Sequence, residues 1–191
     1  MNRLSPLTAA LIVSIPAAAL SQPGYDPAAA MAAQREAMRA LSALDGVWRG
    51  PGSSVLPNGQ KHTLTQTERI GSFLEGTVKV VEGRGYTEAG DVGFNALGII
   101  SYDPVKKAYS LRTYAMGRSA DYALAPTAEG YVWEIPAGPM TLRYNVVIKD
   151  GEWRETGERI SAGNPPVQFF EMKLKRVGDS DWPIAGTIPM K

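Results

Sequence analysis

The sequence predicts an all-β protein, an antiparallel up-and-down barrel of about ten strands preceded by one N-terminal α-helix. Three observations support this prediction. Turn signals built from Gly, Pro, Asn and Asp recur at short intervals after residue 46. The segments between them are rich in Val, Ile, Thr, Tyr and Trp, which favour strands. No helical periodicity interrupts these segments, so neighbouring strands are expected to pair as hairpins.

The composition is that of an ordinary globular protein, and it excludes several kinds of function. The chain has 191 residues, 44% of them hydrophobic and 20% charged, which suits one domain with a buried core. Its formal net charge of +1 gives no basic field for nucleic acid. It has no cysteine, which excludes disulfides, thiolate metal sites and a cysteine nucleophile.

Residues 1–21 have the pattern of a secretory signal peptide. Arg3 precedes an apolar run over residues 7–20, and small residues lead to a predicted cleavage after Ser21. A buried or membrane-spanning helix is the alternative, but Pro16 interrupts the run, which is shorter than the roughly 20 residues that a span needs. We therefore expect a periplasmic or secreted protein, without stable membrane insertion once the signal is cleaved.

A short segment over residues 22–45 precedes the predicted barrel. Within it, residues 27–44 form an Ala-rich helical pattern, for which Asp26 is a suitable N-cap. The apolar residues at helical spacing are Met31, Met38, Leu41 and Leu44. Since the polar face lacks a run of Lys and Arg, we expect a cap across one barrel end rather than a partner-docking or membrane-surface helix. The barrel is predicted over residues 46–178 and a C-terminal tail over 179–191.

The Asp-Gly dipeptide at residues 150–151 assigns the inner face of one hairpin. A two-residue turn there pairs Lys149 with Glu152, and strand alternation then sorts the side chains by face. The more apolar face is the inward one. It carries Leu142, Tyr144, Val146, Ile148, Trp153, Glu155, Gly157 and Arg159. The sequence therefore predicts a carboxylate and a guanidinium inside the barrel.

Three other segments can be assigned in the same way. A turn at Gly117-Arg118 places Tyr109, Leu111, Thr113, Ala115, Ala120, Tyr122 and Leu124 on one apolar face. A two-residue turn at Asn58-Gly59 places Trp48 opposite Arg69, beside Thr63, Thr65 and Thr67, with a bulge expected near Pro51. The last strand alternates Phe170, Met172, Leu174 and Arg176 on its inner side.

The opening Gly46-Val47-Trp48-Arg49-Gly50 and the basic residue ending the last strand resemble a lipocalin-like (calycin) barrel. This resemblance implies that Trp48 closes one end and that Arg176 lies across its indole in a cation–π contact. Over roughly residues 44–177 the chain resembles a bacterial lipocalin-like family of unassigned function. The matching motifs are Tyr102-Asp103-Pro104, Asp150-Gly151-Glu152-Trp153 and Phe170-Glu171-Met172.

Nitrobindins are distant relatives within this resemblance. They share the Gly-x-Trp-x-Gly opening and bind haem through a histidine late in the barrel. Here the single histidine is His62, early in the chain. We therefore expect neither haem nor another cofactor, and a lone histidine does not predict a metal site.

The predicted ligand-binding residues face the lumen, and they are Trp48, Arg69, Tyr122, Trp133, Tyr144, Trp153, Glu155 and Arg159. The first hypothesis is a carrier of a small hydrophobic or amphipathic molecule. The second is an isomerase- or cyclase-type enzyme with Glu155 as general base. The third is a structural envelope protein with a filled barrel. Glu155 is also a candidate for a structural ion pair with Arg159 or Arg69. The sequence carries no signal for a particular oligomeric state.

Overall fold

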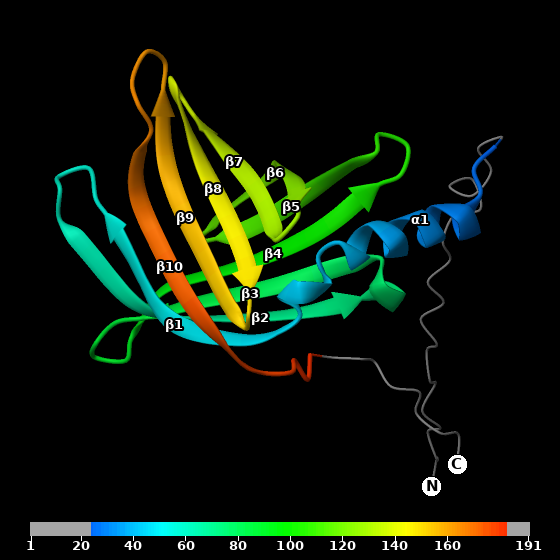
Figure 1. Ribbon diagram of the computed structural model, residues 1–191, viewed down its shortest axis with the longest axis horizontal. Coiled ribbons are helices and arrows are strands. Elements are labelled where there is room, and N and C mark those ends of the chain that lie inside the picture. Colours follow the sequence, from blue (N-terminus) through cyan, green and yellow to red (C-terminus); the bar gives the residue numbers. More distant parts are fainter. Residues whose placement is uncertain (1–23, 183–191) are drawn as a thin grey trace, which may run out of the picture.

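The computed structural model describes residues 24–182 (Figure 1). The predicted signal peptide and residues 183–191 of the predicted tail lie outside this range. The helical segments are α1 (Pro27–Arg39), η2 (Ser42–Leu44) and η3 (Leu74–Gly76). The strands are β1 (Gly46–Val55), β2 (Lys61–Phe73), β3 (Val78–Tyr86), β4 (Val92–Asp103), β5 (Ala108–Ala115), β6 (Arg118–Thr127), β7 (Gly130–Ala137), β8 (Met140–Lys149), β9 (Glu152–Ser161) and β10 (Val167–Gly178).

The ten strands of the described range form one closed antiparallel barrel. Each strand pairs with the next in sequence, and β1 pairs with both β2 and β10. Closure satisfies the backbone groups that an edge strand would leave unpaired. The predicted fold class, a barrel of about ten strands after one N-terminal helix, is confirmed.

The β8–β9 hairpin has the register that its two-residue turn predicts. Lys149 pairs with Glu152 and Val146 pairs with Glu155. Asp150 and Gly151 both have positive φ, 52° and 73°, as this kind of turn requires. Glu155 is therefore on the inner face, as expected.

The β1–β2 hairpin differs from the prediction by one residue. Residues 56–60 form a five-residue loop, in which the Leu56 N–H donates to the Gln60 carbonyl at 2.9 Å. Val55 therefore pairs with Lys61, and Trp48 pairs with Glu68 instead of Arg69. Because side chains alternate along a strand, a slip of one residue exchanges the two faces.

The slip has visible consequences along β2. Its buried side chains are Gln66, Glu68 and Ile70, beside the buried Gly71, whereas Thr63 and Thr65 are exposed. The expected bulge at Pro51 is also absent from the β1–β2 pairing, which runs without a register shift. A shift lies instead in the β1–β10 pairing, between Val47 and Trp48.

Helix α1 lies across one end of the barrel, in contact with β3 and β4 (Figure 1). It ends at Arg39, five residues before the end of the predicted helical pattern, and η2 continues the segment. Two hydrogen bonds attach it to strand residues. Gln34 Nε2 donates to the Tyr102 carbonyl at 3.2 Å, and the Tyr109 hydroxyl donates to the Ala37 carbonyl at 2.8 Å.

Trp48 packs inside the barrel at the helix end. It is 1% exposed, its Nε1 donates to the Leu44 carbonyl at 2.8 Å, and its ring meets Trp153 edge-on at 5.9 Å. The expected cation–π contact is not formed. Within residues 24–182 such contacts involve Arg69, Arg112 and Arg159. Arg176 pairs with Trp48 along the strands. Its guanidinium, however, donates to the Asp45 carbonyl at 3.2 Å.

A buried lysine also lies near this end. The Lys79 side chain is 2% exposed, and its Nζ lies 2.7 Å and 2.8 Å from the two carboxylate oxygens of Asp45. It also donates to Ser72 Oγ at 3.0 Å. Three oxygen acceptors compensate the burial of the ammonium group, so we interpret Lys79 as structural.

In residues 24–182, no helix combines the length and the apolar character that crossing a bilayer requires.

Candidate functional site

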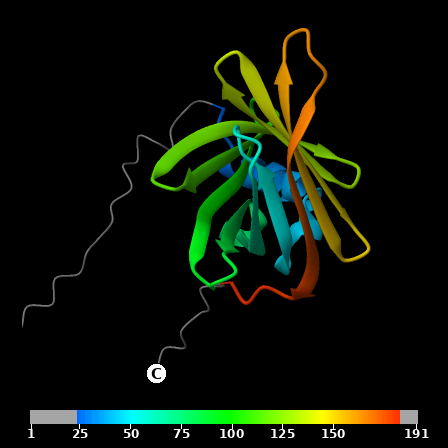
Figure 2. The same ribbon diagram turned by 90° about the vertical axis from the view of Figure 1, so that its left-hand side faces the viewer.

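The inner face of the barrel is packed at one end and accessible at the other. Near α1, Trp48, Ile70, Ile100 and Leu174 are at most 1% exposed. Further along the inner face, a set of aromatic side chains is only half-buried, namely Tyr122, Trp133, Tyr144 and Phe170. Water reaches the inner face of a closed barrel only through the lumen. The half-buried rings thus leave unfilled space on the side of the lumen away from α1, the end from which Figure 2 views the barrel with α1 behind.

Two glutamates lie on the inner face below this aromatic set. Glu68 on β2 pairs with Trp48 and Gly83, and Glu155 on β9 pairs with Val146 and Met172. Each is 8% exposed. Burial of a carboxylate without a compensating partner is unfavourable, so the contacts of these two groups indicate what the lumen can bind.

Each carboxyl group accepts one hydrogen bond from a neighbouring side chain. Gln66 Nε2 donates to Glu68 Oε1 at 2.8 Å. Trp133 Nε1 donates to Glu155 Oε1 at 3.3 Å. The Trp153 indole also faces Glu155, but within residues 24–182 its buried Nε1 does not complete a hydrogen bond with good geometry. One indole donor next to the carboxyl group is thus left unsatisfied.

Two glycines on β3 make room for the side chains of β2. A Cβ at Gly83 would lie 2.7 Å from Glu68 Oε1, and a Cβ at Gly85 would lie 2.9 Å from Gln66 Oε1. Real Cβ atoms do not approach other atoms so closely. The absence of side chains at these positions therefore allows Gln66 and Glu68 to lie flat against the neighbouring strand.

Burial raises the pKa of both glutamates far above the usual range. It raises the pKa of Glu68 to about 8, aided by the negative charges of Glu155 and Glu82 and opposed by the Gln66 hydrogen bond. Burial likewise raises the pKa of Glu155 to about 7, against the effect of the Trp133 and Trp153 indoles. At neutral pH Glu68 is mostly protonated and Glu155 is about half protonated, and the charge of Glu155 opposes ionisation of Glu68.

The expected ion pair between Glu155 and an arginine is not formed. In residues 24–182, no salt bridge involves Glu155 or Glu68. Arg69 pairs with Asp181 and lies 5.2 Å from the Trp182 ring centroid. It is thus not a lumen residue, because the register slip of β2 gives its inward place to Glu68.

Arg159 lies near the open end. Its Nη2 donates to the Val55 carbonyl at 2.8 Å, and its guanidinium carbon lies 4.5 Å from the Phe169 ring centroid. Val55 ends β1 at the loop opposite α1, so these contacts place the guanidinium at the rim of the lumen. The structure therefore separates Arg159 from the two carboxyl groups, and no cation of residues 24–182 compensates their burial.

The aromatic wall consists of rings in direct contact. Trp133 and Tyr144 stack at 4.4 Å with an interplanar angle of 12°, and Tyr122 lies 5.6 Å from Trp133. Burial, followed by the charge of Glu155, raises the pKa of Tyr144 to about 12. Tyr131 is 5% exposed, and burial raises its pKa well above the usual range, again with the charges of Glu155 and Glu68 adding to the effect.

Sequence reasoning missed Gln66, Glu68 and Tyr131. Tyr131 alternates with Trp133 along β7, and that spacing could have identified it as an inner-face residue. The two β2 residues alternate with Ile70, but they could be assigned to the inner face only with the correct loop length.

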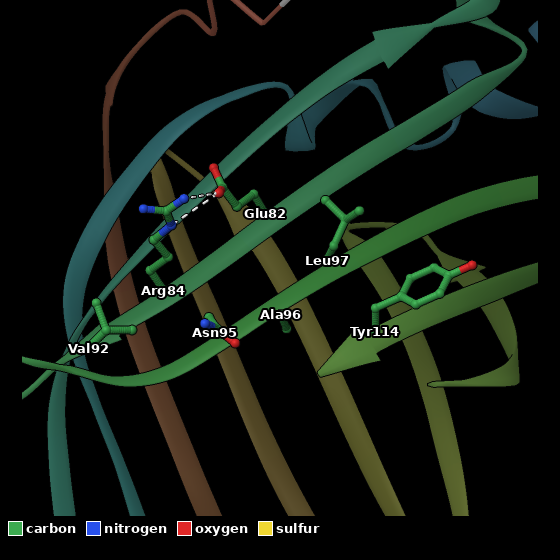
Figure 3. A pocket seen from close by; sticks show the side chains of 7 residues that line it. All are labelled: Glu82, Arg84, Val92, Asn95, Ala96, Leu97 and Tyr114. Atoms are coloured by element: carbon green, nitrogen blue, oxygen red, sulfur yellow. Dashed lines mark hydrogen bonds and ion pairs between the residues drawn. The ribbon is translucent and has the colours of Figure 1, made fainter. Parts of the chain in front are cut away.

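An open hollow of about 530 Å³ lies on the outer surface, over β3, β4 and β5 (Figure 3). It is lined by Glu82, Arg84, Val92, Asn95, Ala96, Leu97 and Tyr114. Glu82 and Arg84 form an ion pair at 2.6 Å, so each charge is already compensated. The hollow contains none of the buried carboxyl groups. We therefore assign the candidate site to the lumen.

The fold and the site together define a closed ten-stranded antiparallel β-barrel, in the described range, whose lumen contains an aromatic wall and two buried acids. No protein-family model matches the chain, and no curated protein matches it. Among solved structures, the chain is similar to the crystal structure of Rv2717c from M. tuberculosis. The TM-score is 0.55 at 15% identity, over 73% of this chain and 96% of that one. This similarity shows a shared fold.

Proposed function

We propose that the chain is an exported lipocalin-like barrel that binds a small hydrophobic or amphipathic molecule in its lumen. The observation that carries the proposal is the accessibility of the inner face at one end, above a floor that is fully packed. The half-buried aromatic side chains supply apolar contact surface, and the deeper polar groups fix orientation, as in typical small-molecule sites. The same half-buried side chains favour a carrier over a barrel filled to its axis.

We therefore propose a revised set of ligand contacts. Tyr122, Trp133 and Tyr144 remain on the wall, with Trp153 and Glu155 deeper in the lumen. Glu68 replaces Arg69 as the polar group from β2. Trp48 belongs to the packed floor, and Arg159 to the rim. The predicted signal peptide over residues 1–21 supports a periplasmic or secreted location.

Native mass spectrometry tests the carrier proposal. The protein without residues 1–21 would be incubated with a bacterial lipid extract, desalted and examined for retained mass. Titration with a panel of hydrophobic ligands would be followed by intrinsic tryptophan fluorescence, since Trp133 and Trp153 lie in the proposed site. A protein that retains nothing and whose fluorescence is unchanged by the panel is not a carrier.

A matched pair of substitutions on β6 locates the binding. Ala120→Phe adds a ring at a half-buried inner-face position, and Ala123→Phe adds the same ring at an exposed outer position. The Ala120→Phe ring would occupy part of the lumen and should weaken binding at least tenfold, about 1.4 kcal/mol. Ala123→Phe should leave binding unchanged. Equal effects would place the ligand outside the lumen.

One observation favours an enzyme as the second candidate function. Glu155 lacks an arginine partner, and burial raises its pKa to about 7, where a carboxyl group exchanges protons readily at neutral pH. Glu68, with a pKa of about 8, would be the matching acid. A base that abstracts a carbon-bound proton incorporates deuterium into the ligand in D2O. Incorporation that Glu155→Gln abolishes would establish an isomerase-type reaction, and its absence would leave the carrier function.

A further inference from the structure

We infer that the polar end of the ligand is a protonated amine, so that the lumen selects a cationic amphiphile over a neutral or an anionic one. The inference rests on the proposed function, and it identifies the ligand class for the same site. Three independent features support it: uncompensated buried acids, an unsatisfied donor beside one of them, and an aromatic wall above them.

The first feature is the charge balance around the two carboxyl groups. The groups that face them are Gln66 on β2, Tyr131 and Trp133 on β7, Tyr144 on β8 and Trp153 on β9, while Glu82 acts on Glu68 from the outer face of β3 and Arg159 acts on Tyr144 from the rim. Arg159 is the one cation in this set, and it is bound at the rim to the Val55 carbonyl. A cation that enters the lumen would therefore meet two acids that form no ion pair with any basic side chain in the described part of the chain.

The second feature is the unsatisfied indole. Trp153 is 2% exposed, and among residues 24–182 its Nε1 faces Glu155 without completing a hydrogen bond, so a buried donor is not fully satisfied. An ionised carboxylate can accept up to about four hydrogen bonds, more than the protonated acid can. If a bound ammonium group ionises Glu155, the carboxylate can accept from both Trp133 and Trp153. One binding step would then supply a cation to the buried acid and an acceptor to the Trp153 Nε1.

The third feature is the stack of Trp133 on Tyr144. Aromatic faces attract ammonium groups, and tryptophan does so most strongly. Tyr122, Phe169 and Phe170 adjoin this stack at ring-centroid distances of 5.6 to 5.9 Å. The wall can therefore contact both an alkyl chain and its cationic end, whereas a carboxylate ligand would face two acids and the negative faces of the rings.

Binding would involve a transfer of protons to solvent and no covalent step. The amine enters with its proton, and a carboxyl group of Glu68 or Glu155 releases its own proton to the buffer. One buried ion pair then replaces one neutral acid. The predicted signature is proton release on binding near pH 7, with an affinity for amines that rises with pH.

Three ligands with the same alkyl chain test the inference: decylamine, decanol and decanoate, each below its micelle concentration. Isothermal titration calorimetry in two buffers of different ionisation enthalpy would give both the affinity and the number of protons released. We expect decylamine to bind about tenfold or more tightly than decanol, with decanoate weakest. We also expect the preference for decylamine to increase from about pH 6 to about pH 8.

Glu68→Gln and Glu155→Gln identify the source of the preference. Each substitution should reduce the preference for decylamine over decanol severalfold and leave decanol binding intact. Glu152→Gln, at an exposed position of β9, should change neither this preference nor decanol binding. Circular dichroism would verify the fold of each variant, and the pH series on the unsubstituted protein decides the question if a variant does not fold. Equal binding of all three ligands, or tightest binding of decanoate, overturns the inference and leaves the carrier function in place. Absence of binding by all three overturns both.

Discussion

Replacement of Glu68 by Gln should make the stability of the barrel less dependent on pH. Glu68 is 8% exposed, and burial raises its pKa from 4.5 to about 8. Below about pH 4 the carboxyl group is protonated in both the folded and the unfolded states. Between these two pKa values the unfolded chain loses this proton and the folded protein keeps it. The free energy of unfolding should therefore fall as the pH rises from about 4.5 to about 8.

The size of the effect follows from the two pKa values. A rise from 4.5 to about 8 corresponds to about 5 kcal/mol if the carboxyl group is fully dehydrated when it ionises. The remaining 8% exposure lets lumen water hydrate the ionised form, so we expect about 3 kcal/mol. The amide oxygen introduced by Glu68→Gln can still accept from Gln66 Nε2, which donates to Glu68 Oε1 at 2.8 Å in the unsubstituted protein. The substitution should therefore be nearly neutral in acid and stabilising in base.

Urea unfolding followed by tryptophan fluorescence, at a series of pH values from about 5 to about 8.5, measures the difference. Glu68→Gln should equal the unsubstituted protein within about 1 kcal/mol at the acid end and exceed it by about 3 kcal/mol at the basic end. Glu152→Gln, at an exposed position, serves as the control and should parallel the unsubstituted protein. If the Glu68→Gln curve also runs parallel, the carboxyl group titrates normally, and the buried acid pair does not exist as described.

Three further predictions concern packing and charge. Trp48→Ala should lower the free energy of unfolding, measured by urea unfolding, by about 3 to 5 kcal/mol, because this 1%-exposed ring fills the floor of the barrel. A loss below about 1 kcal/mol would contradict the closure role of Trp48. Gly83→Ala should cost about 1 kcal/mol or less, because its Cβ would lie 2.7 Å from Glu68 Oε1 and the flexible Glu68 side chain would have to shift. The cost should disappear in a Glu68→Ala background, and equal costs in both backgrounds would exclude this contact as the cause. Asp45→Ala should lower the free energy of unfolding by about 3 kcal/mol or more, because it leaves Lys79 buried without its carboxylate partner. Lys79→Met should cost far less, because the 40%-exposed Asp45 side chain can be hydrated. Equal melting temperatures for the two variants would contradict this difference.

The fold class and one half of the site could be predicted from the sequence, because local chemistry determines them. Strand alternation and regular turn signals are read directly from residue types. A two-residue turn at Asp150-Gly151 leaves one choice of register, so the inward position of Glu155 follows from the turn alone. The preference of these residues for positive φ makes that inference independent of the rest of the barrel.

The other half of the site depends on the tertiary structure. An Asn-Gly dipeptide also occurs in five-residue loops, and the choice between two and five residues exchanges the faces of β2. That exchange brings Glu68 inward and moves Arg69 out to Asp181. The choice is settled only when β2 pairs on both sides, where Gly83 offers the space that Glu68 needs.

The sequence by itself determined which residues form strands and which turns join them, because these depend on a few neighbouring residues. It also indicated that a carboxyl group lies inside the barrel. Only the closed structure decided what surrounds that group, because side chains from β2, β7 and β9 meet across the lumen. The distances between them depend on register and barrel closure, and these involve residues about ninety positions apart in the chain.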